Sequence, residues 1–285
     1  MKDHEAALFA DNFVFLEAPR WHNDRLWVSD VFDCKLYTID SDGSRSLVCD
    51  IPGRPCGIGF LPDDTTVVVS CAQRKLLRVT GKTVSVYADL ADVAAGDLND
   101  LVVDEQGRVY VGNFGYDLFG GAPKTLTNLH VVEPNGEIRV AASGLEFPNG
   151  AVIKDDGHTL VVAETWSGRL TAFDRAESGH LSNAHVYADL GERQPDGICV
   201  DAAGGIWVGC FNTGEFVRVL EGGAITDRVK FNGHAVACAL GGKNGKTLFC
   251  CVFSGTQEEA LAKKPCGAVY TAEVDVPGPT FAAQR

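Results

Sequence analysis

Short apolar runs recur along the chain at a regular spacing, and Gly, Asp or Asn residues bound most of them. The runs are rich in Val, Ile and aromatic residues and are too short for helices, which is typical of β-strands. A third run, such as 35–40 or 169–174, alternates apolar with polar residues and fits a more exposed strand. The clearest set, the second run of each unit, lies at residues 25–30, 65–71, 108–113, 159–164, 205–210 and 247–252.

The repeating unit has a length of roughly 40 to 50 residues and holds four such runs, which predicts a β-propeller built from blades of four antiparallel strands. Six units predict six blades. Five units show a fourth strand of their own, whereas a strand-like run at residues 12–16 precedes the first unit. We therefore expect the N-terminal strand to close the last blade, which removes an open sheet edge. No linker divides the chain, so residues 1–285 are expected to form one all-β domain.

A column of small and polar residues precedes the first apolar run of every unit. In a propeller the innermost strand of each blade lines the central channel, so residues at matching points form a ring around one axis. The loops between second and third strands would surround the mouth of this ring. Two of them, 114–128 and 253–267, are long and are expected to form a lid or wall. The column reads Glu17, Cys56, Asn99, Asn149, Asp196 and, in a looser alignment, His234.

Oxygen donors at four of these positions predict a metal centre with Glu17, Asn149 and Asp196 as ligands and Asn99 nearby. Such donors favour one hard divalent cation, Ca²⁺ first and then Mg²⁺ or Mn²⁺, while Zn²⁺ and Fe²⁺ are less natural alternatives. Few protein ligands leave room for water and a substrate oxygen, and Asp196 could act as the general base. His234 is interpreted as a satisfied polar residue rather than a ligand.

A competing interpretation is open for two ligands, because Asn149-Gly150 and Asp196-Gly197 are also ordinary turn sequences. Turn formation alone does not explain why Glu17 occupies the matching position of its own repeat. Around the mouth, the candidate substrate-binding residues are Asn99, Asp97, Tyr116, Trp166, Phe211 and Asn212.

Composition and charge argue against some classes of binding partner and cellular location. A net charge of −13 argues against a nucleic-acid groove or an anionic membrane surface, both of which need clustered Lys and Arg. The first residues lack an apolar signal region, and no run approaches the ~18 residues that cross a bilayer, so a cytoplasmic protein is expected. Ten cysteines lie mostly in apolar runs and form no C-x-x-C pair, which predicts buried free thiols.

Four motifs resemble those of the senescence marker protein (regucalcin), gluconolactonase and luciferin-regenerating enzyme family, and the similarity covers essentially the whole chain. The motifs are LEAPRW with Glu17, DLNDLVVDEQGRVYVGNFG with Asn99, EFPNGAV with Asn149 and QPDGICVDAAGGIWVG with Asp196. The resemblance implies that the matching Glu, Asn and Asp bind a divalent metal, that Asp196 is the general base, and that Asn99 helps to hold metal or substrate. It also implies a metal-dependent hydrolase that opens lactones.

One departure from the family concerns the substrate. Sugar-lactonase members often carry an Arg two residues before the asparagine that matches Asn99, whereas this chain has Asp97. Aromatic mouth-loop residues favour an apolar or aromatic ligand, so we expect a small lactone or ester other than plain gluconolactone. Two alternatives stay open: hydrolysis of another ester or a phosphotriester at the same metal site, and a non-catalytic propeller that binds a metal or ligand.

Overall fold

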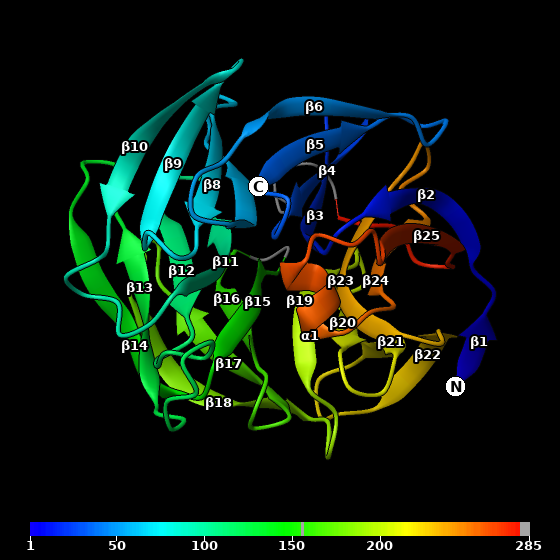
Figure 1. The fold of residues 1–285 in the computed structure, drawn as a ribbon. Coiled ribbons are helices and arrows are strands. Elements are labelled where there is room, and N and C mark those ends of the chain that lie inside the picture. Colours follow the sequence, from blue (N-terminus) through cyan, green and yellow to red (C-terminus); the bar gives the residue numbers. More distant parts are fainter. Residues whose placement is uncertain (155–156, 280–285) are drawn as a thin grey trace.

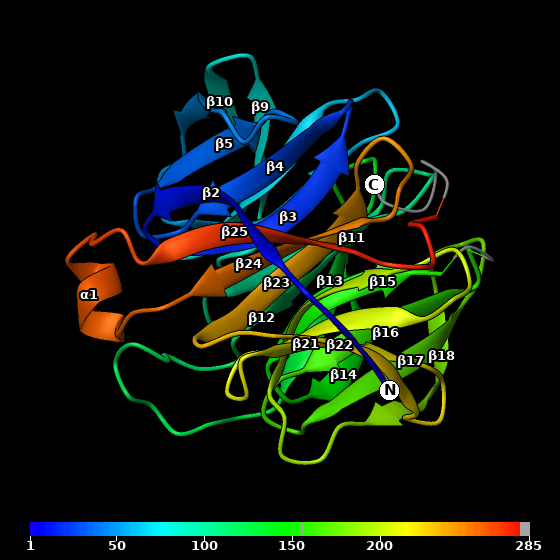
Figure 2. The ribbon, with the colours of Figure 1, turned by 90° about the vertical axis from the view of Figure 1, so that its right-hand side faces the viewer.

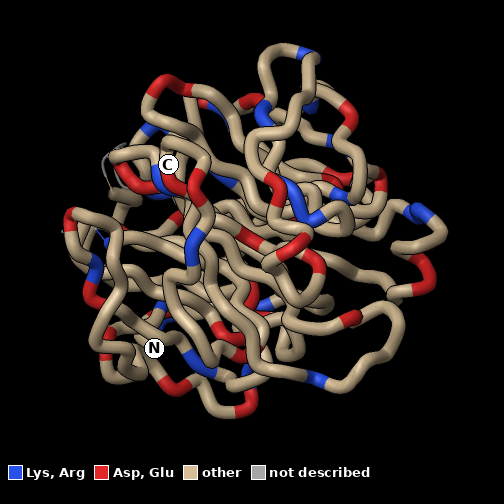
Figure 3. The backbone as a smooth tube through the Cα atoms, turned by 90° about the vertical axis from the view of Figure 1, so that its left-hand side faces the viewer, with Lys and Arg blue, Asp and Glu red and all other residues tan. Residues whose placement is uncertain are grey.

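The computed structural model describes residues 1–154 and 157–279. Its strands form six sheets that follow one another around a central axis (Figure 1), and each sheet holds four antiparallel strands, to which one sheet adds a fifth, parallel strand. This arrangement confirms the predicted six-bladed β-propeller. In the part of the chain described, no helix is long and apolar enough to span a membrane. On the face drawn in Figure 3, Lys and Arg are interspersed with Asp and Glu and form no continuous basic stripe.

The blades follow the order of the chain, and in each the first strand is innermost. Blade one holds β3 (Leu16–His22), β4 (Arg25–Asp30), β5 (Lys35–Ile39) and β6 (Arg45–Asp50). Blade two holds β7 (Pro55–Phe60), β8 (Thr66–Ser70), β9 (Lys75–Thr80) and β10 (Thr83–Asp89). Blade three holds β11 (Leu98–Val103), β12 (Val109–Asn113), β13 (Thr127–Val132) and β14 (Ile138–Leu145).

The second half repeats the pattern. Blade four holds β15 (Pro148–Ile153), β16 (Thr159–Glu164), β17 (Arg169–Arg175) and β18 (Leu181–Asp189). Blade five holds β19 (Pro195–Val200), β20 (Ile206–Cys210), β21 (Glu215–Val219) and β22 (Ile225–Lys230). Blade six holds β23 (His234–Gly241), β24 (Thr247–Phe253), β25 (Gly267–Glu273) and, from the other end of the chain, β2 (Ala7–Phe13). A short helix, α1 (Gln257–Leu261), lies between β24 and β25.

The N-terminal segment closes the ring. β2 pairs antiparallel with β25, which confirms the predicted closure. The apolar run at 12–16 is divided between two blades, because Asp30 accepts hydrogen bonds from the backbone N–H groups of Val14 and Phe15 and turns the chain out of β2 into β3. The sequence pattern did not predict β1 (Lys2–His4), which adds a parallel fifth strand to blade five beside β22.

The innermost strands pack closely against one another, and this explains the small residues that follow the column positions. A Cβ atom on Gly197 would lie 2.3 Å from the Cβ of Ala237, and one on Gly150 would lie 2.6 Å from the backbone N of Ile198. Both glycines lie within strands and lack a positive φ. The turn interpretation of Asn149-Gly150 and Asp196-Gly197 is therefore wrong, since close contact between neighbouring strands requires the glycines.

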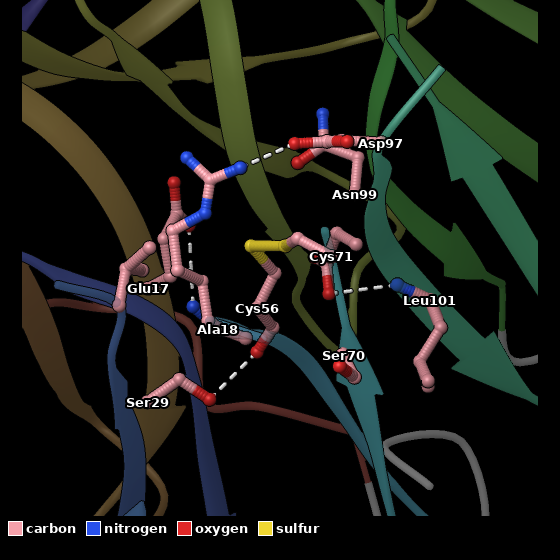
Figure 4. The surroundings of a disulfide bond; sticks show 12 residues. Glu17, Ala18, Ser29, Cys56, Ser70, Cys71, Asp97, Asn99 and Leu101 are labelled. Carbon is pink, nitrogen blue, oxygen red and sulfur yellow. Dashed lines mark hydrogen bonds and ion pairs between the residues drawn. A yellow bond between two sulfur atoms is a disulfide. The ribbon is translucent and has the colours of Figure 1, made fainter. Parts of the chain in front are cut away.

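The prediction of free thiols is wrong for one pair of cysteines. Cys56 and Cys71 form a disulfide, with Cα atoms 6.3 Å apart. Cys56 lies near the start of β7, within its irregular register, and Cys71 directly follows the end of β8, so the two cysteines lie at the same end of adjacent antiparallel strands. Figure 4 shows the disulfide between Glu17 on one side and Asn99 on the other. The other eight cysteines are free, and all of them lie in the described residues.

Candidate metal centre and substrate cavity

The column residues meet in space. Five of them are the second residue of an innermost strand, and His234 is the first residue of β23. All six line one cavity of about 510 Å³ at the mouth of the channel. Each innermost strand also has an irregular register with its neighbour at or just after this position. A bulge re-aims a side chain that regular pairing would place elsewhere, so the repeated bulges help to direct the ring toward the channel.

Two carboxylates of the ring share a dry environment. Burial raises the pKa of Glu17 well above its ordinary value, and the negative charges of Asp196 and Asp100 raise it further. Burial likewise raises the pKa of Asp196 to about 8, although a hydrogen bond from Asn149 opposes the shift. Among the described residues that line the cavity, none is Lys or Arg. The two carboxylates therefore lack a cationic partner of their own on the cavity wall.

The amide side chains are oriented by the protein. The Nδ2 group of Asn149 donates to the hydroxyl of Thr165 at 3.2 Å, and that hydroxyl donates to the Pro195 carbonyl at 2.8 Å. Asn99 donates from Nδ2 to the Pro148 carbonyl at 3.2 Å. Because carbonyl oxygens only accept, these bonds fix which amide atom is nitrogen and leave both Oδ1 atoms as acceptors.

Two buried oxygens of the site have no protein partner. Asn149 Oδ1 and Asp196 Oδ1 are both shielded from solvent and accept no hydrogen bond from the described residues. Buried polar atoms are almost always paired, so such orphans call for an explanation such as an ion. A hard divalent cation would satisfy both oxygens and offset the charge of Glu17 and Asp196.

The donor set therefore fits a cation, but only with amide oxygens included. Within residues 1–154 and 157–279, no three His, Cys, Asp or Glu side chains converge on one point. A cation held by Glu17 and Asp196 would need Asn149 as its third protein ligand, with Asn99 close by.

A buried ion pair between β3 and β11 lies next to the ring. Arg20 Nη2 lies 2.8 and 3.0 Å from the two carboxylate oxygens of Asp100 and donates to the Leu101 carbonyl at 3.0 Å. Farther along the same strands, a small cavity of about 40 Å³ is lined by Arg20 and Cys199 among others. Asp100 is paired with this guanidinium, whereas neither Glu17 nor Asp196 forms an ion pair within the described residues, and the nearby charge of Arg20 only partly opposes the rise in the pKa of Glu17.

The rest of the cavity wall is mainly aromatic. The two long loops contribute to it as predicted, since Phe119 belongs to the loop after β12, and Gln257 and Ala260 belong to α1 after β24. Both loops project from the same side of the propeller (Figure 2). The aromatic residues that line the cavity are Phe15, Phe32, Phe114, Phe119, Phe147, Trp166, Phe211 and Phe253.

Three predicted substrate-binding residues lie behind this wall. Asp97 forms an ion pair with Arg54, whose guanidinium lies 4.2 Å from the ring centre of Phe119. The Tyr116 hydroxyl accepts a hydrogen bond from Trp166 Nε1 at 2.9 Å. Asn212 accepts from the backbone N–H of Gln194 at 2.8 Å and donates to the Glu192 carbonyl at 2.8 Å. These contacts support the loops and side chains of the wall, whereas Asn99, Trp166 and Phe211 line the cavity itself.

The sequence did not single out several residues of the site. Phe147 lines the cavity with a left-handed backbone (φ +57°), and its ring stacks on Phe114 at 4.6 Å. A bulky residue with positive φ is an unusual conformation that concentrates at functional sites. Thr165 and Gln194 also line the cavity. Phe147 and Gln194 stand two residues before Asn149 and Asp196, so the repeat itself carried a signal for them.

Fold and site together define a six-bladed propeller with an oxygen-lined centre at the floor of an aromatic cavity. The chain belongs to the family described as SMP-30/Gluconolactonase/LRE-like region, whose model matches residues 15–254. The regucalcin of Danio rerio is 28% identical over 235 residues, which cover 80% of this chain and 76% of that protein. Alignments with the regucalcins of Macaca fascicularis and Homo sapiens cover 60% of those proteins.

Solved structures of related proteins share the fold. A regucalcin of Agrobacterium tumefaciens, described as a calcium-binding protein, superposes with a TM-score of 0.81 at 18% identity, covering 100% of this chain and 99% of that one. A gluconolactonase of Xanthomonas campestris gives a TM-score of 0.77 at 21% identity, covering 95% and 89%. At these identities the structural likeness supports the fold alone.

Proposed function

We propose that this protein is a divalent-metal-dependent lactonase that acts on a small neutral lactone with an apolar or aromatic body. The observation that carries the proposal is a group of buried oxygens in one ring: Oδ1 of Asn149 and Oδ1 of Asp196 have no partner among the described residues, and burial raises the pKa of both Glu17 and Asp196. Membership of the SMP-30/Gluconolactonase/LRE-like region family supports lactonase chemistry, and the calcium-binding description of one relative supports the metal.

In this proposal Glu17, Asn149 and Asp196 hold the cation. A bound divalent cation would polarise the lactone carbonyl and stabilise the negative charge that develops on its oxygen. Asp196 accepts a proton from water as the water oxygen bonds to the carbonyl carbon. The ring C–O bond then breaks, the leaving oxygen takes a proton, and a hydroxy acid results. Asn99, beside Asn149 in the ring, presents its Oδ1 to the substrate.

The cavity wall supports the apolar part of the proposal. Eight aromatic residues line the cavity, while the described wall residues provide no Lys or Arg to recognise a carboxylate or phosphate. The Arg54 guanidinium is engaged by Asp97 and by the ring of Phe119 and does not line the cavity. A polyhydroxylated sugar lactone would find few fixed hydrogen-bonding partners on this wall.

A substrate panel measured on one preparation tests the proposal. The protein is stripped with a chelator, divided, and reloaded with Ca²⁺, Mg²⁺, Mn²⁺ or Zn²⁺, and kcat/KM is measured for gluconolactone, alkyl lactones, aryl lactones, an aryl ester and a phosphotriester. We expect turnover only after reloading and the highest kcat/KM on an aryl or alkyl lactone. Full turnover by the stripped protein would contradict the metal requirement, and no turnover on any member of the panel would identify a binding protein instead.

A further inference from the structure

His234 is the sixth member of the ring, and the proposed reaction gives it no role. Among the described residues that line the cavity, those with ionisable side chains are Glu17, Asp196 and His234, since Cys56 is bonded in a disulfide. His234 begins β23, which packs against both β3 and β19. It therefore lies between the strand of Glu17 and the strand of Asp196, at the same level of the channel.

A backbone carbonyl selects one tautomer of this histidine. Nδ1 of His234 lies 3.0 Å from the carbonyl oxygen of Phe211. Because a carbonyl can only accept, Nδ1 carries the proton and Nε2 of the neutral ring has a free lone pair. No protein donor to Nε2 is found in the described parts of the chain. The imidazole is thus an acceptor that the protein has oriented and left unused.

Aromatic neighbours hold the ring in one orientation. Phe211 stacks on His234 with ring centres 4.3 Å apart and planes 13° from parallel. Phe253 lies near it with centres 6.1 Å apart and planes 24° from parallel. Both phenylalanines also line the cavity. A rigid acceptor within an apolar wall discriminates well between ligands, because an unmatched donor or acceptor loses its water without compensation.

The cavity wall also has two threonine hydroxyl groups, and both already form hydrogen bonds within the protein. Thr165 donates to the Pro195 carbonyl, and the Thr256 hydroxyl accepts from the Glu259 backbone N–H as the cap of α1. The Oδ1 atom of Asn149 belongs to the proposed metal centre. Gln194 and Gln257 also line the cavity, but no hydrogen bond from the described residues orients their side-chain amides. His234 Nε2 is therefore the acceptor that the protein holds in a fixed orientation and leaves free to contact the body of a substrate.

We propose that His234 recognises a hydrogen-bond donor on the substrate, so that the preferred substrate is an apolar or aromatic lactone that carries a free hydroxyl or N–H group. This inference rests on the proposed function and adds the feature that distinguishes one neutral lactone from another. His234 acts here by binding, and the catalytic proton transfer is left to Asp196.

A matched pair of substrates tests the role: an aryl hydroxylactone and its O-methyl ether. One net hydrogen bond corresponds to a preference of about tenfold, and we expect wild type to show such a preference in kcat/KM for the hydroxylated member. His234→Phe keeps a flat ring between Phe211 and Phe253 but has no acceptor, so the two substrates should be used equally. His234→Gln offers a carbonyl oxygen and should restore part of the preference. His185→Phe is the matched control, because its Nδ1 also bonds a backbone carbonyl, at 2.9 Å, but on the outermost strand of blade four.

A binding measurement with compounds that cannot be hydrolysed tests this inference independently of the proposed lactonase activity. A hydroxylated aryl cyclopentanone and its methyl ether cannot be hydrolysed, and their binding is followed by tryptophan fluorescence, to which Trp166 of the wall contributes. If His234→Phe alone abolishes a preference that wild type shows for the hydroxylated ketone, the inference holds even when no lactone is hydrolysed. A wild type without preference, or a His234→Phe variant that keeps it while both proteins melt at similar temperatures, would overturn the inference.

Discussion

The side-chain amide of Asn149 donates a hydrogen bond to the hydroxyl of Thr165 across 3.2 Å. Thr165 passes the interaction on to the carbonyl of Pro195, the residue before Asp196. Three residues from two blades are thereby linked, and the amide oxygen of Asn149 is left without a protein partner. The orientation of Asn149 thus depends, through Thr165, on Pro195, the first residue of the strand that carries Asp196.

Removing this link should weaken metal binding without removing any ligand. In Thr165→Val the shape of the side chain is kept, but Asn149 loses the acceptor that orients its amide. Groups that orient metal ligands typically contribute 10- to 100-fold in affinity, so we expect calcium affinity measured by calorimetric titration to fall by roughly that factor. Thr165→Ser keeps the hydroxyl and serves as the control, with affinity close to wild type. Equal affinity in Thr165→Val and wild type would show that the amide needs no such support.

Asp196→Asn should weaken metal binding and turnover while leaving the protein folded. The substitution removes a buried carboxylate that has no cationic partner, so the metal-free variant should unfold at a temperature at least as high as that of metal-free wild type. Calcium should raise the unfolding temperature of wild type by much more than that of the variant. Lactone turnover should fall by about 10²-fold or more, because the proposed general base is lost.

Asp97→Asn provides the comparison for this variant, since the Asp97 carboxylate pairs with Arg54 behind the cavity wall. It should keep the calcium-induced rise in unfolding temperature. A full calcium effect in Asp196→Asn, measured in the same series, would show that Asp196 does not hold the cation.

Phe147→Leu should change substrate preference. The Phe147 ring stacks on Phe114 and lies 5.0 Å from Trp166, so the substitution keeps apolar bulk but removes aromatic contacts. Aromatic pairs contribute about 0.5–1.5 kcal/mol beyond buried area, so KM for an aryl lactone should rise roughly 3- to 10-fold. KM for a small alkyl lactone should change little. Phe9→Leu, which alters a ring packed on Phe249 outside the cavity, is the control, and an equal rise for both lactones would argue against aromatic recognition.

Acid should destabilise the protein through His130. This ring is buried on β13, neither nitrogen has a partner among the described residues, and burial lowers its pKa. The folded state therefore resists protonation, while the unfolded chain takes up a proton as the pH falls below about 6.5. The stabilising contribution is complete above that pH and is lost progressively as the pH falls toward the lowered pKa of the folded state.

Denaturant unfolding at pH 7.5 and 5.5 measures this effect. Between these values wild type should lose up to about 1.4 kcal/mol of unfolding free energy more than His130→Leu. His185→Leu, at a partly exposed histidine of β18, should lose as much as wild type. An identical loss in wild type and His130→Leu would place the acid sensitivity elsewhere.

The sequence was sufficient to predict the fold because the repeat shows the same signal six times. The apolar runs gave the strands, and the phase of the column gave the ring that Glu17, Asn149 and Asp196 share. The pattern was weaker where tertiary contacts decide, as at Asp30, which divides the apolar run at 12–16 between two blades. The short strand β1 carries no apolar alternation and forms because β22 offers it an edge.

The polar and aromatic parts of the cavity were predicted less completely. Asp97 and Asn212 do not line the cavity, because their side chains are occupied by Arg54 and by backbone groups, and sequence alone does not show such pairings. Phe147 was missed because an aromatic residue near a strand resembles a core residue. The glycines after Asn149 and Asp196 had two readings in sequence, and only the distances between adjacent strands distinguish them.

The seam between β2 and β25 also constrains how the molecule is made. β2 ends at Phe13, yet its partner β25 begins at Gly267, so β2 must wait until the intervening strands of every blade have been synthesised. During that interval its backbone groups have no sheet to join, and an unpaired strand can associate with another chain. Blades one to five can assemble before β25 is synthesised, but the circle is completed only when β25 meets β2.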